Sequence, residues 1–142
     1  MYSCIVIGAG PGGIVAVKEL LEKGIKDVLC LEQSDTLGGV FAKGYDNLIL
    51  TSSVTFSMFS DYWVGEGMDH HFWSKDEAVS YWDSYADHFG VKEHIRYSSK
   101  VAEVVSIAED HWQIRLASDE LIETKRLILA IGNNNVPKYP DR

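Results

Sequence analysis

The sequence has few cysteines, few prolines, a deficit of basic residues and no long hydrophobic run. Its two cysteines, Cys4 and Cys30, do not form a C-x-x-C pair, so a redox dithiol is not indicated. Both lie in apolar, strand-like runs, which predicts buried free thiols suited to a reducing cytoplasm. No apolar run approaches the ~20 residues of a membrane span. The first expected strand begins at residue 2 or 3, which leaves no room for a signal peptide. We therefore expect a cytoplasmic protein without a membrane partner.

The shortage of lysine and arginine restricts the possible partners further. Thirteen basic and 21 acidic residues give a formal net charge of −8. This balance argues against binding to nucleic acid or to anionic membrane surfaces, because both require basic patches. It also means that any bound phosphate must be held by local groups, against the field of the whole protein. The length of 142 residues and the hydrophobic content of 46% predict one globular domain with a core of its own.

The N-terminal third of the chain has the pattern of a β–α–β unit. Residues 3–7 form a continuous, β-branched apolar run, which is typical of a buried parallel strand. Pro11 suits the first turn of a helix, apolar residues then recur at helical spacing, and Gly24 is a natural C-cap. Residues 27–32 predict the second strand, so the unit has about the 30 residues expected of a β–α–β motif.

A second long helix is predicted in the middle of the chain. Ser74 and Glu77 have the spacing of a capping box, and Gly90 should end the helix that they begin. Before this helix, residues 48–51 predict a short strand and residues 54–59 a helical turn.

After this helix the pattern changes to that of strands, at residues 95–97, 100–108, 112–116 and 126–131. Turns at residues 109–110 and 118–119 make the middle strands an antiparallel meander. The last strand is apolar throughout and should return to the parallel sheet. We therefore predict an α/β, Rossmann-like fold with a parallel sheet, a helix on each side and a small antiparallel β-meander.

The segment GAGPGG, residues 8–13, matches the motif G-x-G-x-x-G and lies between the first strand and the first helix. Gly8 permits the tight turn, Gly10 lets the backbone approach a pyrophosphate, and Gly13 lets the helix pack closely on the strand. The phosphates would then lie at the positive end of the helix. Glycines that serve only a tight turn are the structural alternative.

Glu32 ends the second strand 19 residues after Gly13, where dinucleotide-binding proteins have an acid. A carboxylate there accepts hydrogen bonds from the adenosine ribose and repels the extra phosphate of NADP, so the sequence predicts an NAD or FAD half-site. The alternative is an exposed acid at the end of a strand.

Other candidate sites have weaker support. His70 and His71 are adjacent and would point apart on a helix or strand, so we predict no metal site. The aromatic-rich residues 56–73 are more typical of core or of an interface than of a substrate cage. Asn133, Asn134 and Asn135 predict a turn. No catalytic triad spacing is evident, and no catalytic residue is predicted.

Five features resemble the flavin-containing monooxygenases, which are flavoproteins with two dinucleotide-binding domains, and the resemblance covers the whole chain. The first is GAGPGG followed by Glu32, and LEQSDTLGGVF resembles the acid-to-Gly-Gly segment of that family. LTSSVTFSMFSDYW is similar to the stretch of the family that ends in Ser-Asp-Phe/Tyr-Pro. SKDEAVSYWDSYADHFGVKEHIRYSSKV resembles the helix and strand that follow, and LILAIG stands at the family's Ala-Thr-Gly strand end.

The resemblance implies that the cofactor is FAD rather than NAD. It places the flavin end of FAD near Gly39, Val40 and Phe41, and the adenine beside the backbone near Val101. The cofactor-binding residues indicated by the motif and the resemblance together are Gly8, Gly10, Pro11, Gly12, Gly13, Glu32, Gln33, Gly39, Val40, Phe41, Thr51, Ser52, Val101, Ala130 and Gly132.

The function implied by the resemblance is that residues 1–142 are the N-terminal FAD-binding domain of a monooxygenase-like oxidoreductase. In such an enzyme NADPH reduces the flavin, which then reacts with oxygen. The sequence has no second G-x-G-x-x-G motif, so NADPH would need a further domain. Partners besides FAD would be the remainder of the enzyme, or a second copy in a homo-oligomer formed through residues 56–73.

Two alternatives to this function stay open. Thr51 stands where the family commonly has an asparagine, which permits a non-oxygenating flavin reductase. The other alternative is a non-catalytic nucleotide-binding or scaffold module.

Overall fold

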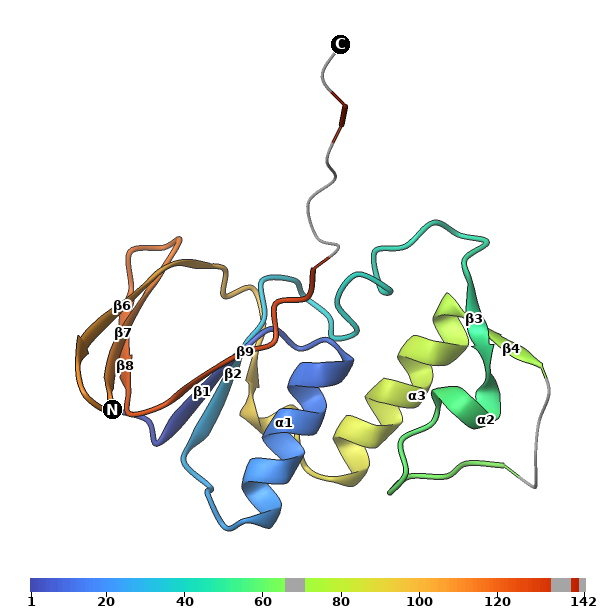
Figure 1. Ribbon diagram of the computed structural model, residues 1–142, viewed down its shortest axis with the longest axis horizontal. Coiled ribbons are helices and arrows are strands. Elements are labelled where there is room, and N and C mark those ends of the chain that lie inside the picture. The colour runs from blue at the N-terminus through green and yellow to red at the C-terminus, as the bar shows by residue number, and fades with distance from the viewer. Residues whose placement is uncertain (66–70, 134–138, 141–142) are drawn as a thin grey trace.

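A parallel sheet of four strands lies at the centre of the structure (Figure 1). The computed structural model describes residues 1–65, 71–133 and 139–140. The strands have the spatial order β5-β2-β1-β9, and neighbouring strands are parallel. Their bounds are β1 Cys4–Ile7, β2 Val28–Leu31, β5 Ile95–Arg96 and β9 Leu127–Leu129. The inner position of β1 explains why all of its residues are buried, and the predicted return of the last strand to this sheet is confirmed.

The two faces of this sheet are covered by different layers, because side chains alternate along a strand. Cys4 and Val6 of β1 lie in one apolar cluster with the helices α1 (Pro11–Glu22) and α3 (Lys75–His88). Ile5 and Ile7 lie in a second cluster, against the antiparallel sheet of β6, β7 and β8. The bounds of that sheet are β6 Val101–Ala108, β7 His111–Leu116 and β8 Leu121–Thr124.

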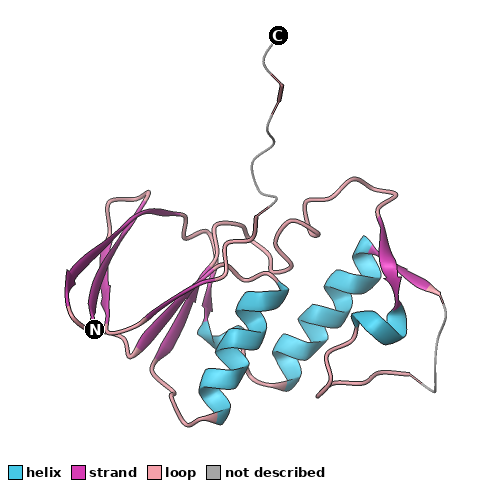
Figure 2. Cartoon of the chain, viewed as in Figure 1, coloured by secondary structure: helices cyan, strands magenta, loops and turns pink. Residues whose placement is uncertain are grey.

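The prediction of a helix on each side of the sheet is therefore wrong. Both long helices lie on the same side (Figure 2), because the meander has an apolar face of its own that buries the opposite side. That face consists of Ile114, Leu116 and Ile122. The meander itself is confirmed, and its turns contain Asp110 and Asp119 in the left-handed conformation.

The long helices begin and end where the sequence indicates. The Ser74 side chain accepts the N–H of Glu77, and the Glu77 carboxylate accepts the N–H of Ser74 at 2.8 Å, so the capping box is complete. Gly24 has a φ of +80° and donates its N–H to Leu21 O just after α1. Gly90 has a φ of +66° just after α3. These local predictions are confirmed because capping depends on neighbours within a few residues.

A small unit packs beside α3. It consists of β3 (Ile49–Ser53), the single turn α2 (Val54–Ser57) and β4 (Phe72–Ser74), which pairs antiparallel with β3. The strand and the helical turn expected at residues 48–51 and 54–59 correspond to β3 and α2. The strands β4 and β8 were not predicted. Both are short, and each is defined by its pairing with another strand, β4 with β3 and β8 with β7. A 3-10 turn, η1 (Lys92–His94), leads into β5.

The aromatic residues of segment 56–73 have two different roles. Phe59, Tyr62 and Trp73 make ring contacts with Tyr81 or Tyr85 of α3, at centroid separations of 4.7–5.8 Å. These residues are core, as the sequence favoured. Large apolar side chains of the same region are exposed, namely Phe56, Trp63 and Phe72.

A nearly buried lysine joins α1 to this segment. The ammonium of Lys18 lies 2.6 Å from Asp61 and 2.8 Å from Glu22, while its side chain is only 5% exposed. It also lies 5.2 Å from the centre of the Phe89 ring. The hydrogen bond to Asp61, followed by that to Glu22, raises the pKa of Lys18, and the same ammonium lowers the pKa of Asp61. The ion pair therefore stabilises the position of segment 56–65 against the helix that follows the glycine motif.

The cysteines are free and buried, as predicted. Burial raises the pKa of Cys30 to about 12. Within the described ranges, no helix has the length and apolar character needed to cross a membrane.

Candidate functional site

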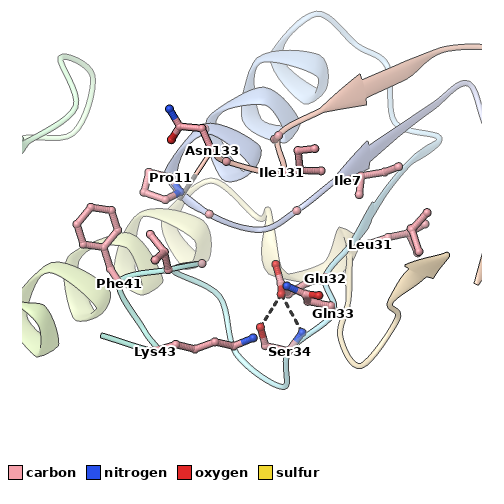
Figure 3. Close-up of a pocket in the computed structure, with 18 of the residues that line it drawn as sticks. Ile7, Pro11, Leu31, Glu32, Gln33, Ser34, Phe41, Lys43, Ile131 and Asn133 are labelled. Carbon is pink, nitrogen blue, oxygen red and sulfur yellow. Dashed lines mark hydrogen bonds between the residues drawn. The ribbon is translucent and has the colours of Figure 1, made fainter. Parts of the chain in front are cut away.

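A cavity of about 570 Å³ opens at the carboxyl ends of the parallel strands (Figure 3). Ile7 and Leu31, the last residues of β1 and β2, line it together with Ala130, which follows β9. From β1 the chain proceeds to β2 and β5 on one side, whereas β9 pairs with the other side of β1. Open α/β sheets bind ligands at such a switch point in strand order.

Two glycines of the glycine-rich loop lie so close to other backbone atoms that neither position has room for a Cβ atom. A Cβ on Gly8, whose φ is +103°, would lie 2.5 Å from Ala130 O. A Cβ on Gly13 would lie 1.8 Å from Gly8 O, so α1 starts directly against the end of β1. These two glycines are therefore required by packing, in the roles that the motif predicts for them.

Gly10 and Gly12 instead line the cavity and leave space free there. A Cβ on Gly12 would meet nothing within 4 Å, and a Cβ on Gly10 would come no closer than 3.9 Å to Gly39 Cα. Gly10 is the N-cap of α1, no side chain caps this helix end, and the first turn contains no acidic residue. The loop thus leaves an open, uncapped helix N-terminus at the cavity, which favours an anion such as a phosphate.

Glu32 lies beside this loop and is 4% exposed, so it is not the exposed acid that was the alternative. Its Oε2 accepts the backbone N–H of Ala9 at 2.8 Å. Its Oε1 accepts the backbone N–H of Ser34 at 2.8 Å and the Ser34 hydroxyl at 2.6 Å. Burial works to raise the pKa of Glu32, but these hydrogen bonds prevail and hold that pKa below its usual range. The carboxylate therefore braces the glycine-rich loop against the end of β2.

We expect Glu32→Gln to destabilise the domain by about 1–3 kcal/mol. The carboxylate accepts three hydrogen bonds, whereas glutamine has one neutral carbonyl oxygen and an amide nitrogen that cannot accept. Glu93→Gln is a matched control, since Glu93 is exposed on η1. Urea unfolding of the three proteins at pH 7 measures the difference.

The pH dependence provides a second check on Glu32. Because its pKa is lowered in the folded protein, its stabilisation is complete above the unfolded value of about 4.3 and is lost as the pH falls through the folded pKa. The gap between wild type and Glu32→Gln should therefore close in acid. A gap of constant size from pH 7 to pH 3 would contradict this role of the charge.

The structure brings most of the predicted binding residues together around this cavity. Those that line it are Gly8, Gly10, Pro11, Gly12, Glu32, Gln33, Gly39, Val40, Phe41, Val101, Ala130 and Gly132. Gly13 is not among the lining residues and packs against the backbone of Gly8. Thr51 and Ser52 lie on β3 and are not among the lining residues.

Several lining residues were missed by the sequence reasoning. They are Ile7, Leu31, Ser34, Lys43, Ser99, Ile131 and Asn133. Ile7, Leu31 and Ile131 lie at or next to the ends of the strands predicted at residues 3–7, 27–32 and 126–131, and that position could have indicated them. The others lie in loops, whose paths have no periodic signal in the sequence. Ser99 reaches the cavity because its N–H donates to Glu32 O at 2.8 Å.

The described residues contain no group of three or more metal-ligating side chains. His71 lies 3.7 Å from Glu77, and His70 is outside the described residues, as are Asn134 and Asn135 of the predicted turn.

Comparisons with known proteins agree with this geometry. The family described as pyridine nucleotide-disulphide oxidoreductase matches residues 5–142. The 4-hydroxybenzoate brominase (decarboxylating) of Marinomonas mediterranea is 37% identical over 142 residues, which cover 96% of this chain and 27% of the brominase. Flavin-containing monooxygenase 1 of Homo sapiens is 26% identical over 133 residues, which cover 84% of this chain and 25% of that protein.

Among solved structures, OTEMO in complex with FAD and NADP superposes with a TM-score of 0.85 at 25% identity, covering 99% of this chain and 27% of OTEMO. The chain thus spans 25–27% of the length of these three proteins. The Rossmann-like fold and the resemblance to flavin monooxygenases are confirmed.

Proposed function

Because the chain belongs to the pyridine nucleotide-disulphide oxidoreductase family, we propose that residues 1–142 are the FAD-binding domain of a flavin-dependent monooxygenase that uses NADPH. The observation that carries this proposal is the cavity itself, which joins an uncapped helix N-terminus to a buried acid at the end of β2. The likeness to the FAD and NADP complex of OTEMO supports the choice of cofactor. The NADPH site would lie in a further part of the enzyme.

The residues around the cavity fit the two ends of FAD. Gly10 and Gly12 leave room for a pyrophosphate at the start of α1, and Glu32 at the end of β2 would accept from the adenosine ribose. Val40, Phe41 and Ile131 offer an apolar surface for the flavin ring, and Phe41 is fixed by an edge contact with Trp82 at 5.1 Å. When bound, the flavin supplies the redox chemistry, and the protein binds and orients it.

The uncapped helix N-terminus and Glu32 would contact the adenosine diphosphate part of FAD. The apolar residues at the flavin end are less enclosed, because Val40 and Ile131 are 47% and 55% exposed. We therefore expect this 142-residue chain to bind ADP and FAD with dissociation constants within about tenfold, a difference of about 1.4 kcal/mol. Isothermal titration with ADP and FAD measures both constants. We also expect no NADPH oxidation by the FAD-loaded chain above that of free flavin.

The possible outcomes test two separate hypotheses, that the cavity binds a dinucleotide and that this chain alone holds the flavin ring loosely. Absence of binding by both ligands would refute the dinucleotide site. FAD binding more than about 100-fold tighter than ADP binding, a gap of about 2.7 kcal/mol, would show that this chain holds the flavin ring firmly by itself.

A further inference from the structure

The hydrogen bonds of Glu32 limit what this residue can offer a ligand. An ionised carboxylate has about four acceptor positions. Ala9 and Ser34 occupy three of them in this structure. One acceptor position therefore remains, whereas the ribose of an adenosine nucleotide presents two neighbouring hydroxyl groups. The second hydroxyl needs another polar group in the wall of the cavity.

Lys43 is such a group. It is the one cationic side chain among the described residues that line the cavity. In the close-up its side chain extends along the cavity wall, and its ammonium points toward Ser34 and Glu32 (Figure 3). Its charge contributes to the lowered pKa of Glu32, which agrees with this proximity.

Lys43 also has no partner of its own within the described ranges. Lys18, Lys75 and Lys92 make ion pairs with acidic residues, whereas Lys43 makes neither a hydrogen bond nor an ion pair there. An exposed cation at the cavity wall is thus available to a ligand. This availability is notable in a protein with a net charge of −8.

We propose that Lys43 is a second ribose-recognition residue, which donates a hydrogen bond to one hydroxyl oxygen of the adenosine ribose while Glu32 accepts from the other hydroxyl. This inference rests on the proposed function. An ammonium can only donate and the carboxylate can only accept, so the two side chains bind the diol with complementary polarity. The phosphates have a separate set of donors at the start of α1, and the ammonium points toward Glu32.

The test uses Lys43→Met, which keeps the apolar stem and removes the charge. Lys26→Met is the matched control, because Lys26 is exposed in the loop between α1 and β2, at the opposite end of the sheet. Titration calorimetry measures the dissociation constants of ADP, 2′-deoxy-ADP and 3′-deoxy-ADP for each protein.

For the wild type we expect each missing hydroxyl to weaken binding about tenfold, the effect of one hydrogen bond to a charged group. In Lys43→Met, ADP binding should weaken about tenfold, and the penalty for one of the two deoxy analogues should vanish while the other persists. Lys26→Met should keep both penalties.

Two results would overturn the inference. Both penalties could persist in Lys43→Met with unchanged ADP affinity, which would leave Lys43 without a role. They could also persist with weakened ADP affinity, which would assign the ammonium to a phosphate. A wild type that binds none of the three nucleotides would instead refute the proposed function.

Discussion

Gly13→Ala is expected to destabilise the domain strongly. The added Cβ would lie 1.8 Å from Gly8 O and 2.9 Å from Gly8 C, and both are backbone atoms. Relief of this overlap would require α1 to move away from β1, whose residues are buried on both faces. The cost should reach or exceed about 3 kcal/mol, the upper end for overpacked sites. A natural domain has a total stability of about 5–15 kcal/mol.

Gly12→Ala is the control for this experiment, because it adds the same methyl group one residue earlier in the same helix. Nothing lies within 4 Å of the added Cβ. Alanine also favours a helix over glycine by about 0.5–1 kcal/mol, so the control should be as stable as the wild type or slightly more stable. Circular dichroism during urea unfolding compares the three proteins. Equal midpoints for Gly13→Ala and Gly12→Ala would contradict the close approach of α1 to β1.

Gly10→Val is expected to abolish dinucleotide binding while the domain stays folded. Gly10 has a φ of −73°, which valine adopts without strain, and a Cβ there would lie 3.9 Å from Gly39 Cα. The valine methyl groups would instead occupy the mouth of the cavity, where a pyrophosphate must approach the backbone. We expect ADP affinity to fall at least about 100-fold, or about 2.7 kcal/mol.

Two measurements make this result interpretable. The melting temperature without ligand should match that of the wild type, which shows that the fold is retained. Addition of ADP should then raise the melting temperature of the wild type and not that of Gly10→Val, because a ligand stabilises only the state that binds it. A folded valine variant with wild-type ADP affinity would remove the pyrophosphate from this loop.

Much of the site could be predicted from the sequence because its parts lie close together in the chain. The turn of residues 8–13, the cap at Gly24 and the acid at residue 32 all belong to one β–α–β unit, in which local conformation determines the geometry. The capping box of Ser74 and Glu77 is equally local. Local rules therefore predicted these features correctly.

The tertiary structure decided which layers and which loops meet. Helices α1 and α3 share one side of the sheet because the meander buries Ile5 and Ile7 on the other, and no local pattern distinguishes those two arrangements. Lys43 and Ser99 meet Glu32 at the cavity from two separate loops that both follow it in the chain, at positions with no periodic signal. The sequence by itself determined the glycine-rich loop and the acid beside it, since both depend on neighbouring residues. The remaining walls of the cavity depend on long-range packing, in which distant segments must bury apolar surface together before their polar side chains can meet.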